Sequence, residues 1–503
     1  MASSGDNSSA ASPFRAFATR PDVLAALALG CLYVAVIGAH NYSIDGLLMY
    51  RQAVSIVQDH SLRFAVPIYW GDIFTSSKYG IGLSALYLPG VTLASWFGLT
   101  APAPHANVYD WDLFYRDPVY AWGAAPISIL LTVATAYLIA RFIRELGYGS
   151  RVALLGLVGF GIASPAMVYA RGDFAQPLLG FCLIAGLLAA VRFRRSRSRK
   201  ALIVAAATMF LAILTRPVEG SLLLPALVAV IAPNLRLRSW KPETYRALAV
   251  VGGLFVAGVV VTLLVNWGRY GSPVQSGYTQ VSWGTPIWVG LPGVLVSPAR
   301  GILWQFPLIV LAPLGLSTVW RSEHRLFAIV ITGLTAALLL NTALWVPWWG
   351  AQSWGSRLFV PALPMVAVAA AIGTLSLGPG LRKWLPAALL LGGIAWALPG
   401  TVTNLLGGYA SRYDGSTQSF ALSGYPPVGA WRFVHHLGSQ SPTDANGLDI
   451  AWIRLAQTTH NISIAVPIVL LALACFLALR TIRLERALVA QSHVQPSARP
   501  EPT

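Results

Sequence analysis

Runs of about 20 apolar residues, each long enough to cross a bilayer as a helix, recur along this chain of 503 residues. A soluble fold has no use for so many runs of that length. Since 56% of the residues are hydrophobic and 11% are charged, we expect an all-α polytopic membrane protein. Cys31, Cys182 and Cys475 lie inside apolar runs, which indicates packing rather than a disulfide framework or a metal site.

The formal net charge of +17 is not distributed as in a nucleic-acid-binding protein. The basic residues gather in short loops between apolar runs, and the richest of these loops is Arg192–Lys200. Loops of this kind are typical of the cytoplasmic side of a membrane protein. We therefore expect a multi-pass protein of the plasma (inner) membrane, with both termini in the cytoplasm and no nucleic-acid partner.

The positions of the basic loops set the expected topology, because two crossings must separate consecutive cytoplasmic loops. This holds only if the apolar stretch Ile81–Leu99, which contains Pro89 and Gly90, forms an interfacial or re-entrant helix instead of a span. Twelve spans then remain, at residues 22–39, 119–140, 152–169, 174–191, 201–217, 219–233, 247–266, 302–319, 326–345, 358–376, 385–400 and 461–479.

This topology puts 23 of the 35 Lys and Arg, but only 7 of the 18 Asp and Glu, on the cytoplasmic side. The few basic residues on the outer side therefore call for a reason. The expected organisation is a cytoplasmic tail (1–21), a transmembrane module (22–400) whose first outer loop is 40–118, an outer loop or small cap (401–460), a last span (461–479) and a cytoplasmic tail (480–503).

Asp45 opens the first outer loop, five residues after the first apolar run. An acid near a bilayer face is rare and raises a functional hypothesis. Its carboxylate could accept a proton from a hydroxyl nucleophile. It could equally cap the helix predicted over Gly46–Val57, and the residue type leaves both roles open. Asp173 is a second outer carboxylate, either functional or a turn residue paired with Arg171.

Four cations of the outer side are candidate phosphate ligands: Lys78, Arg216, Arg300 and Arg357. Lys78 could also be a snorkelling residue, and Arg216 is expected to pair with Glu219 or to face a cavity. The candidate sugar- or acceptor-binding aromatic residues are Tyr79, Tyr270, Tyr278, Trp348, Trp349 and Trp354. Part of this aromatic content belongs to an interfacial belt. Together the groups suit a lipid-anchored phosphosugar that enters sideways from the membrane.

At these residues the chain resembles the GT-C superfamily of polyprenyl-phosphate-dependent glycosyltransferases, in the branch of the protein O-mannosyltransferases and the lipid A aminoarabinose transferase. Asp45 matches the family's acidic position after the first span. Ser77-Lys78-Tyr79-Gly80 stands at a Lys-Pro-Pro-Leu-like motif without its prolines, and Tyr169–Asp173 resembles an aromatic–Arg…Asp segment. Segments around Trp267–Tyr278 and Trp348–Pro364 are similar to patterns in bacterial members.

The resemblance implies an inverting transfer of a sugar from a polyprenyl-phosphate donor to an acceptor hydroxyl at the outer (periplasmic) face. Asp45 would be the base, with Asp173 as a second catalytic carboxylate, and cations, foremost Lys78 and Arg357, would bind the leaving phosphate. The acceptor would be a lipid, a glycan or a protein. We expect no cofactor and no metal site, although the resemblance leaves a divalent cation open.

Three other functions compete with this one. An outer-face ligase or polymerase that uses lipid-diphosphate glycans would rely on Arg432, His435 and His436 in the last outer loop. A transporter or lipid flippase would need charged residues in the middle of its spans, whereas the ionisable residues here lie at span ends, and no internal repeat is present. A membrane scaffold without catalytic activity is the remaining alternative.

Overall fold

The structure is a computed structural model that describes residues 20–70, 72–102, 117–232, 240–278, 283–403, 412–425, 448–459 and 462–494. Much of the predicted segment 401–460, with Arg432, His435 and His436, lies outside these ranges, as do residues 1–19 and 495–503 of the two predicted tails.

The described residues form a helical bundle in which seven helices are long and apolar enough to cross a membrane. They are α6 (Ala125–Glu145, preceded by the π-helical η1, Tyr120–Ala124), α9 (Gln176–Ser196), α13 (Pro242–Tyr270), α17 (Arg325–Leu344), α18 (Leu363–Gly373, flanked by η4, Arg357–Ala362, and η5, Thr374–Ser376), α19 (Pro379–Val402) and α24 (Ala465–Val494, preceded by η8, Ile462–Ile464).

Shorter helices complete the bundle. They are α2 (Pro21–Ala35), α7 (Ser150–Ile162), α8 (Ala166–Tyr169), α10 (Arg199–Thr215), α11 (Pro217–Ser221), α12 (Leu223–Ile231), α14 (Ile287–Val296), α15 (Ile302–Gln305), η3 (Pro307–Leu311) and α16 (Ala312–Trp320). Outside it are α3 (Ile44–Gln58), the antiparallel strands β1 (Ile68–Trp70) and β2 (Asp72–Phe74), α4 (Ile81–Trp96), α21 (Ser416–Ser419), η6 (Leu422–Gly424) and α23 (Ala451–Thr459).

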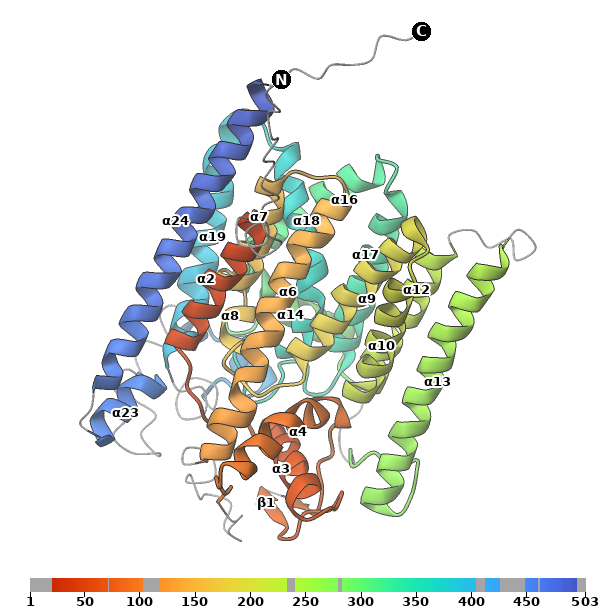
Figure 1. Cartoon of the computed structure of the whole chain (residues 1–503), viewed down its shortest axis with the longest axis vertical. Coiled ribbons are helices and arrows are strands. Elements are labelled where there is room, and N and C mark those ends of the chain that lie inside the picture. The colour runs from red at the N-terminus through yellow and green to blue at the C-terminus, as the bar shows by residue number, and fades with distance from the viewer. Residues whose placement is uncertain are drawn as a thin grey trace, which may run out of the picture.

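The two ends of the bundle differ in construction (Figure 1). Helix α2 begins and α24 ends at the upper end of the view, and these two helices pack along each other. Helices α3, α4 and α23 and the β1–β2 hairpin lie at the lower end. The fold thus presents its first loop and its last described loop on the same side.

The predicted spans correspond to helices, but three of them are interrupted. Residues 152–169 form α7 and α8, 219–233 fall on α11 and α12, and 302–319 form α15, η3 and α16. Pro165 precedes α8 and Pro307 begins η3. Proline lacks a backbone N–H and clashes with the preceding turn, which explains those two breaks inside continuous apolar sequence.

Helix α4 lies beside α3 at the lower end of the bundle, as expected for a juxtamembrane helix (Figure 1). The Ser84 hydroxyl donates to the Met49 carbonyl of α3 at 2.7 Å. Gly90, next to the internal Pro89, lets α4 meet η1 closely, because a Cβ there would lie 2.0 Å from the Gly123 carbonyl oxygen. The sequence did not predict α14, a short apolar helix between α13 and α15 that packs against α17.

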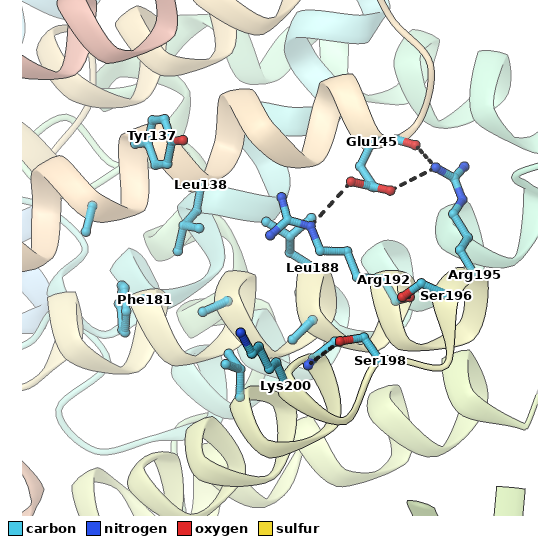
Figure 2. A pocket seen from close by; sticks show the side chains of 15 residues that line it. Tyr137, Leu138, Glu145, Phe181, Leu188, Arg192, Arg195, Ser196, Ser198 and Lys200 are labelled. Carbon is cyan, nitrogen blue, oxygen red and sulfur yellow. Dashed lines mark hydrogen bonds and ion pairs between the residues drawn. The ribbon is translucent and has the colours of Figure 1, made fainter. Parts of the chain in front are cut away.

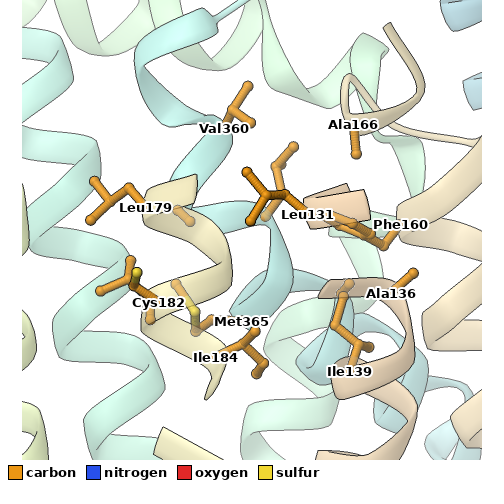
Figure 3. Close-up of a cluster of buried hydrophobic side chains, with 14 of the residues drawn as sticks. Leu131, Ala136, Ile139, Phe160, Ala166, Leu179, Cys182, Ile184, Val360 and Met365 are labelled. Atoms are coloured by element: carbon orange, nitrogen blue, oxygen red, sulfur yellow. The ribbon is translucent and has the colours of Figure 1, made fainter. Parts of the chain in front are cut away.

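The core is a packed layer of apolar side chains from α6, α7, α9 and α18 (Figure 3). Cys182 is fully buried within it, as predicted, whereas Cys475 is exposed on α24. The prediction that Cys475 serves core packing was therefore wrong, because α24 contacts the bundle mainly through α2 and leaves much of its surface uncovered.

Small residues let helices approach closely where apolar burial gives no net gain, as in lipid. A Cβ on Gly315 of α16 would lie 1.8 Å from the Ala369 carbonyl oxygen of α18, whereas a Cβ on Gly333 of α17 would meet nothing within 4 Å. We expect Gly315→Ala to destabilise the protein by about 1–3 kcal/mol. Gly333→Ala should be neutral or stabilise it by up to about 1 kcal/mol.

Thermal unfolding in detergent measures both effects. A Gly315→Ala protein as stable as Gly333→Ala would contradict the close approach of α16 and α18.

Candidate functional site

Asp45 lies in the first turn of α3 but does not cap this helix. The cap is Ser43, whose hydroxyl accepts from the Gly46 N–H at 2.9 Å. The alternative interpretation of Asp45 as the cap residue was therefore wrong, because its side chain is directed to other partners.

Two side chains hold the two oxygens of the Asp45 carboxylate. Arg357, the first residue of η4, donates to Oδ2 at 2.8 Å, and the Tyr79 hydroxyl donates to Oδ1 at 2.5 Å. The Arg357 guanidinium also lies over the Phe174 ring, 4.9 Å from its centroid. Burial, followed by the charge of Asp45, raises the pKa of Tyr79 well above its usual value, so this phenol remains a donor at neutral pH. The carboxylate stays partly accessible, with 17% of the Asp45 side chain exposed.

Asp173 lies behind the turn that carries Asp45. Its carboxylate accepts from the Tyr42 N–H at 2.9 Å and from the Ser43 hydroxyl at 3.1 Å. A Cβ on Gly46 would lie 1.9 Å from the Asp173 carboxyl carbon, so a side chain at this position would have to displace the Asp173 carboxylate. Asp173 is fully buried, and its contacts make it a positioning group for Ser43 and the turn.

A cavity of about 400 Å³ opens near Asp45. It lies between the start of α4, the α10–α11 junction and the last turns of α13. Tyr79 lines it and also contacts Asp45. The Tyr79 and Tyr278 rings meet edge to face, 5.9 Å apart, and Trp283 and Trp345 contribute to the same wall. The cavity therefore combines an aromatic lining with access to the neighbourhood of Asp45.

Lys78 and Arg216 both line this cavity. Arg216 pairs with Glu219, with its Nε 2.8 Å from a carboxylate oxygen, so the predicted pairing and the predicted cavity position are both found. Lys78 is surrounded by aromatic rings, and its ammonium lies 5.1 Å from the Phe74 centroid and 5.8 Å from that of Tyr278. Among the described residues, Lys78 forms no ion pair.

Arg269 also lines this cavity, although it was not among the candidate cations predicted from the sequence. It is 3% exposed, and it donates to the Gln52 side chain at 3.1 Å and to the Tyr79 carbonyl at 2.7 Å. Within the described part of the chain its Nη2 has no hydrogen-bond partner and no carboxylate neutralises it. The available signal was an arginine in the last turn of a long apolar segment, where a charge is costly without a function.

The other predicted aromatic and cationic residues lie away from the cavity. Arg300 is buried and donates to the carbonyl groups of Ser353, Ala351 and Tyr413, which ties the tryptophan-rich segment to the loop at residue 413. Trp348 packs against Gly293, and Trp354 packs against Trp396 with centroids 5.2 Å apart; both tryptophans are buried.

Two further predicted residues anchor loops. Trp349 donates to the Asp414 carboxylate at 2.8 Å, and the Tyr270 hydroxyl donates to the Ser77 carbonyl at 3.0 Å. The second contact fixes the segment that carries Lys78. Neither residue lines the cavity, so the structure brings together Lys78, Tyr79, Arg216 and Tyr278 from the predicted set, with Asp45 and Arg357 adjoining.

A second buried charge cluster joins the last described loop to the first. Arg171 pairs with Asp449 at 2.8 Å rather than with Asp173, and His40 lies 2.9 Å from the same carboxylate. Arg454 donates to Asp449 and to the Gly38 carbonyl. Burial raises the pKa of Asp449, but His40, Arg454 and Arg171 outweigh it and hold that pKa well below its usual range. This cluster anchors the loop that leads to Asp45.

Among the residues that the structure describes, no three His, Cys, Asp or Glu side chains are grouped so that they could hold a metal ion.

The buried Asp173 predicts a pH dependence of stability. Burial, opposed by the hydrogen bonds from Tyr42 and Ser43, raises its pKa to about 7, from 3.8 for an ordinary aspartate. Between these values the folded state binds more protons than the unfolded state, so this group's contribution to stability is full below about pH 4 and is lost as pH rises through 7. The slope reaches about 1.4 kcal/mol per pH unit.

We expect Asp173→Asn to flatten the fall in melting temperature between pH 4 and 7 relative to the wild type, as measured by thermal unfolding in detergent. Asp59→Asn, an exposed change at the other end of α3, is the control. Parallel curves for Asp173→Asn and the wild type would exclude the raised pKa.

Comparison with known proteins shows similarity at the level of the fold. No protein-family model matches the chain, and no curated protein sequence matches it significantly. The apo crystal structure of ArnT from Cupriavidus metallidurans matches with a TM-score of 0.51 and 16% identity, over 92% of this chain and 76% of that one. Its structure bound to undecaprenyl phosphate matches with 0.51 and 14%, over 93% and 77%. The chain therefore shares the polytopic membrane fold of these ArnT structures.

Proposed function

We propose that this protein is an integral membrane glycosyltransferase that moves a sugar from a polyprenyl-phosphate donor to an acceptor hydroxyl of a lipid, glycan or protein, with inversion at the anomeric carbon. The observation that carries the proposal is the cavity beside Asp45, where Lys78 and the Nη2 of Arg269 have no carboxylate partner among the described residues. It is supported by the fold shared with ArnT, which was solved with undecaprenyl phosphate bound.

The two uncompensated cations favour an anionic ligand. A buried arginine without a counter-ion is costly, and an anion that enters the cavity relieves this cost. A phosphate offers oxygens to the guanidinium and to the lysine ammonium in charge-assisted hydrogen bonds. Arg216 adds less attraction, because Glu219 already neutralises it. Lys78 and Arg269 are therefore the phosphate ligands that we place first.

Asp45 is the proposed general base. The Arg357 ion pair and the Tyr79 hydrogen bond orient its carboxylate. An acceptor hydroxyl replaces one of these donors when it binds, which gives it direct access to a carboxylate oxygen. A base must lie within hydrogen-bond reach of the proton it removes, and 17% exposure of this side chain leaves that approach open.

The proposed step forms one bond to the anomeric carbon, breaks another, and moves one proton. The acceptor oxygen attacks the anomeric carbon, its proton passes to Asp45, and the bond between that carbon and the phosphate oxygen breaks. The electron pair of this bond leaves with the polyprenyl phosphate. Lys78 and Arg269 stabilise the charge that develops on the phosphate, so the leaving group needs no proton. The rings of Tyr79 and Tyr278 supply a stacking surface for the sugar.

The site is proposed to face the periplasm. It lies at the lower end of the bundle in Figure 1, opposite the end at which α2 begins and α24 ends. That opposite end carries the basic residues of the α6–α7 and α9–α10 connections and the last turns of α24. The excess of Lys and Arg there supports a cytoplasmic location for it, and hence cytoplasmic termini.

Removal of the base should abolish transfer. We expect Asp45→Asn to lower turnover by at least about 100-fold, because the amide cannot accept the proton. Asp59→Asn, at the C-cap of the same helix, should retain full turnover. The assay is transfer of radiolabelled sugar from polyprenyl-phosphate donors to a membrane extract in detergent, with detection of a covalent product. Undiminished turnover of Asp45→Asn would exclude it as the base.

Removal of the free cation should weaken donor binding. We expect Lys78→Gln to reduce the affinity for undecaprenyl phosphate by about tenfold, because a charge-assisted hydrogen bond contributes roughly 1.5 kcal/mol. Arg63→Gln, an exposed change in the same loop, should have no effect. Microscale thermophoresis in detergent measures both. Equal affinity of Lys78→Gln and Arg63→Gln would remove Lys78 from the phosphate site.

A further inference from the structure

A second cavity, of about 510 Å³, opens at the other end of the bundle between α6, α9 and the start of α10 (Figure 2). It extends from the middle of α6 and the first half of α9 to the C-terminal ends of these helices, whereas Asp45 and the first cavity lie at their N-terminal ends. The two cavities share no residue. Whatever occupies the second cavity does not touch the proposed catalytic site.

The floor of this second cavity is apolar. Ala134 of α6 and Ala185 and Ala189 of α9 line it, and their small side chains leave space between the helices. Phe181 and Leu188 complete the wall (Figure 2). The floor belongs to helices that are long and apolar enough to cross a membrane, so a hydrocarbon chain matches it and a soluble anion does not.

The rim of the cavity is basic. Arg192 and Arg195 both pair with Glu145, at 3.4 Å and 3.0 Å, so one carboxylate serves two guanidinium groups. Lys200, at the start of α10, also lines the cavity and has no ion pair within the described ranges. Figure 2 shows Arg192 and Lys200 on opposite sides of the opening. The rim therefore keeps an excess of positive charge directly above an apolar floor.

We propose that this cavity binds one anionic glycerophospholipid of the cytoplasmic leaflet. Its phosphate lies among Arg192, Arg195 and Lys200, and one acyl chain lies along Ala185 and Ala189. A cytoplasmic excess of basic residues requires no cavity, and Arg480, Arg483 and Arg486 of α24 are exposed without lining this one. Basic pockets between transmembrane helices are where anionic headgroups bind. The assignment to the cytoplasmic leaflet rests on the proposed orientation, but the site itself does not.

Lipid retention tests the proposal. The purified protein is incubated with phosphatidylglycerol and phosphatidylcholine of identical acyl chains, and the bound lipids are counted by native mass spectrometry. We expect phosphatidylglycerol to be retained at least about fivefold over phosphatidylcholine. The triple change Arg192→Gln, Arg195→Gln, Lys200→Gln should remove this preference. The matched triple change Arg480→Gln, Arg483→Gln, Arg486→Gln removes the same charge from α24 and should preserve it.

Two further measurements separate recognition of the lipid headgroup from recognition of the acyl chain. Ala185→Phe fills the floor without a change of charge and should also lower retention, whereas inorganic phosphate should not raise the melting temperature. The single change Lys200→Gln, at an exposed position, covers the case in which the triple variant does not fold. Equal retention of both lipids, equal loss in the α24 control, or stabilisation by phosphate alone would overturn the proposal. Sugar transfer is not measured in this test, so its outcome is independent of the proposed activity.

Discussion

The ion pair between Asp45 and Arg357 joins two parts of the chain that are 312 residues apart in sequence. It holds the first turn of α3 against η4, and Tyr79 completes the contact from the start of the α4 segment. Three separate segments thus converge on one carboxylate. Asp173 supports the turn from behind, and the Arg171–Asp449 cluster anchors the chain before it. The proposed site depends on this convergence, because none of the three segments could place Asp45 alone.

Charge pairing separates most cations of this protein from those that we propose to bind phosphate. Charges near bilayer depth are costly, so most are neutralised or hydrogen-bonded. Arg216 has Glu219, Arg171 has Asp449, and Arg300 is surrounded by carbonyl groups. Against this background, Lys78 and the Nη2 of Arg269 stand out among the described residues. At the other end, Glu145 is shared by two arginines next to an unpaired Lys200. Each excess of positive charge lies beside a cavity, where we propose that a lipid phosphate binds.

Features of the fold that depend on a short segment of sequence could be predicted, whereas others could not. Apolar length and loop charge predicted the helices, the end at which Asp45 lies and the non-crossing α4. The interruptions at Pro165 and Pro307 and the short helix α14 were missed, because an apolar run has the same composition whether it is one helix or two. The pairing of Arg216 with Glu219 was predictable, since residues three positions apart on a helical turn are neighbours.

The sequence by itself determined an all-α membrane protein with Asp45 and Lys78 in the same predicted loop, because hydrophobic length and charge are properties of local segments. Only the tertiary structure decided that Arg357 and Tyr79 hold Asp45, that Arg269 enters the cavity and that Trp348 and Trp354 are buried. An apolar helix in a membrane protein can present any of its faces to lipid or to protein, so its sequence leaves open which side chains point inward. Packing between helices distant in sequence settles that choice.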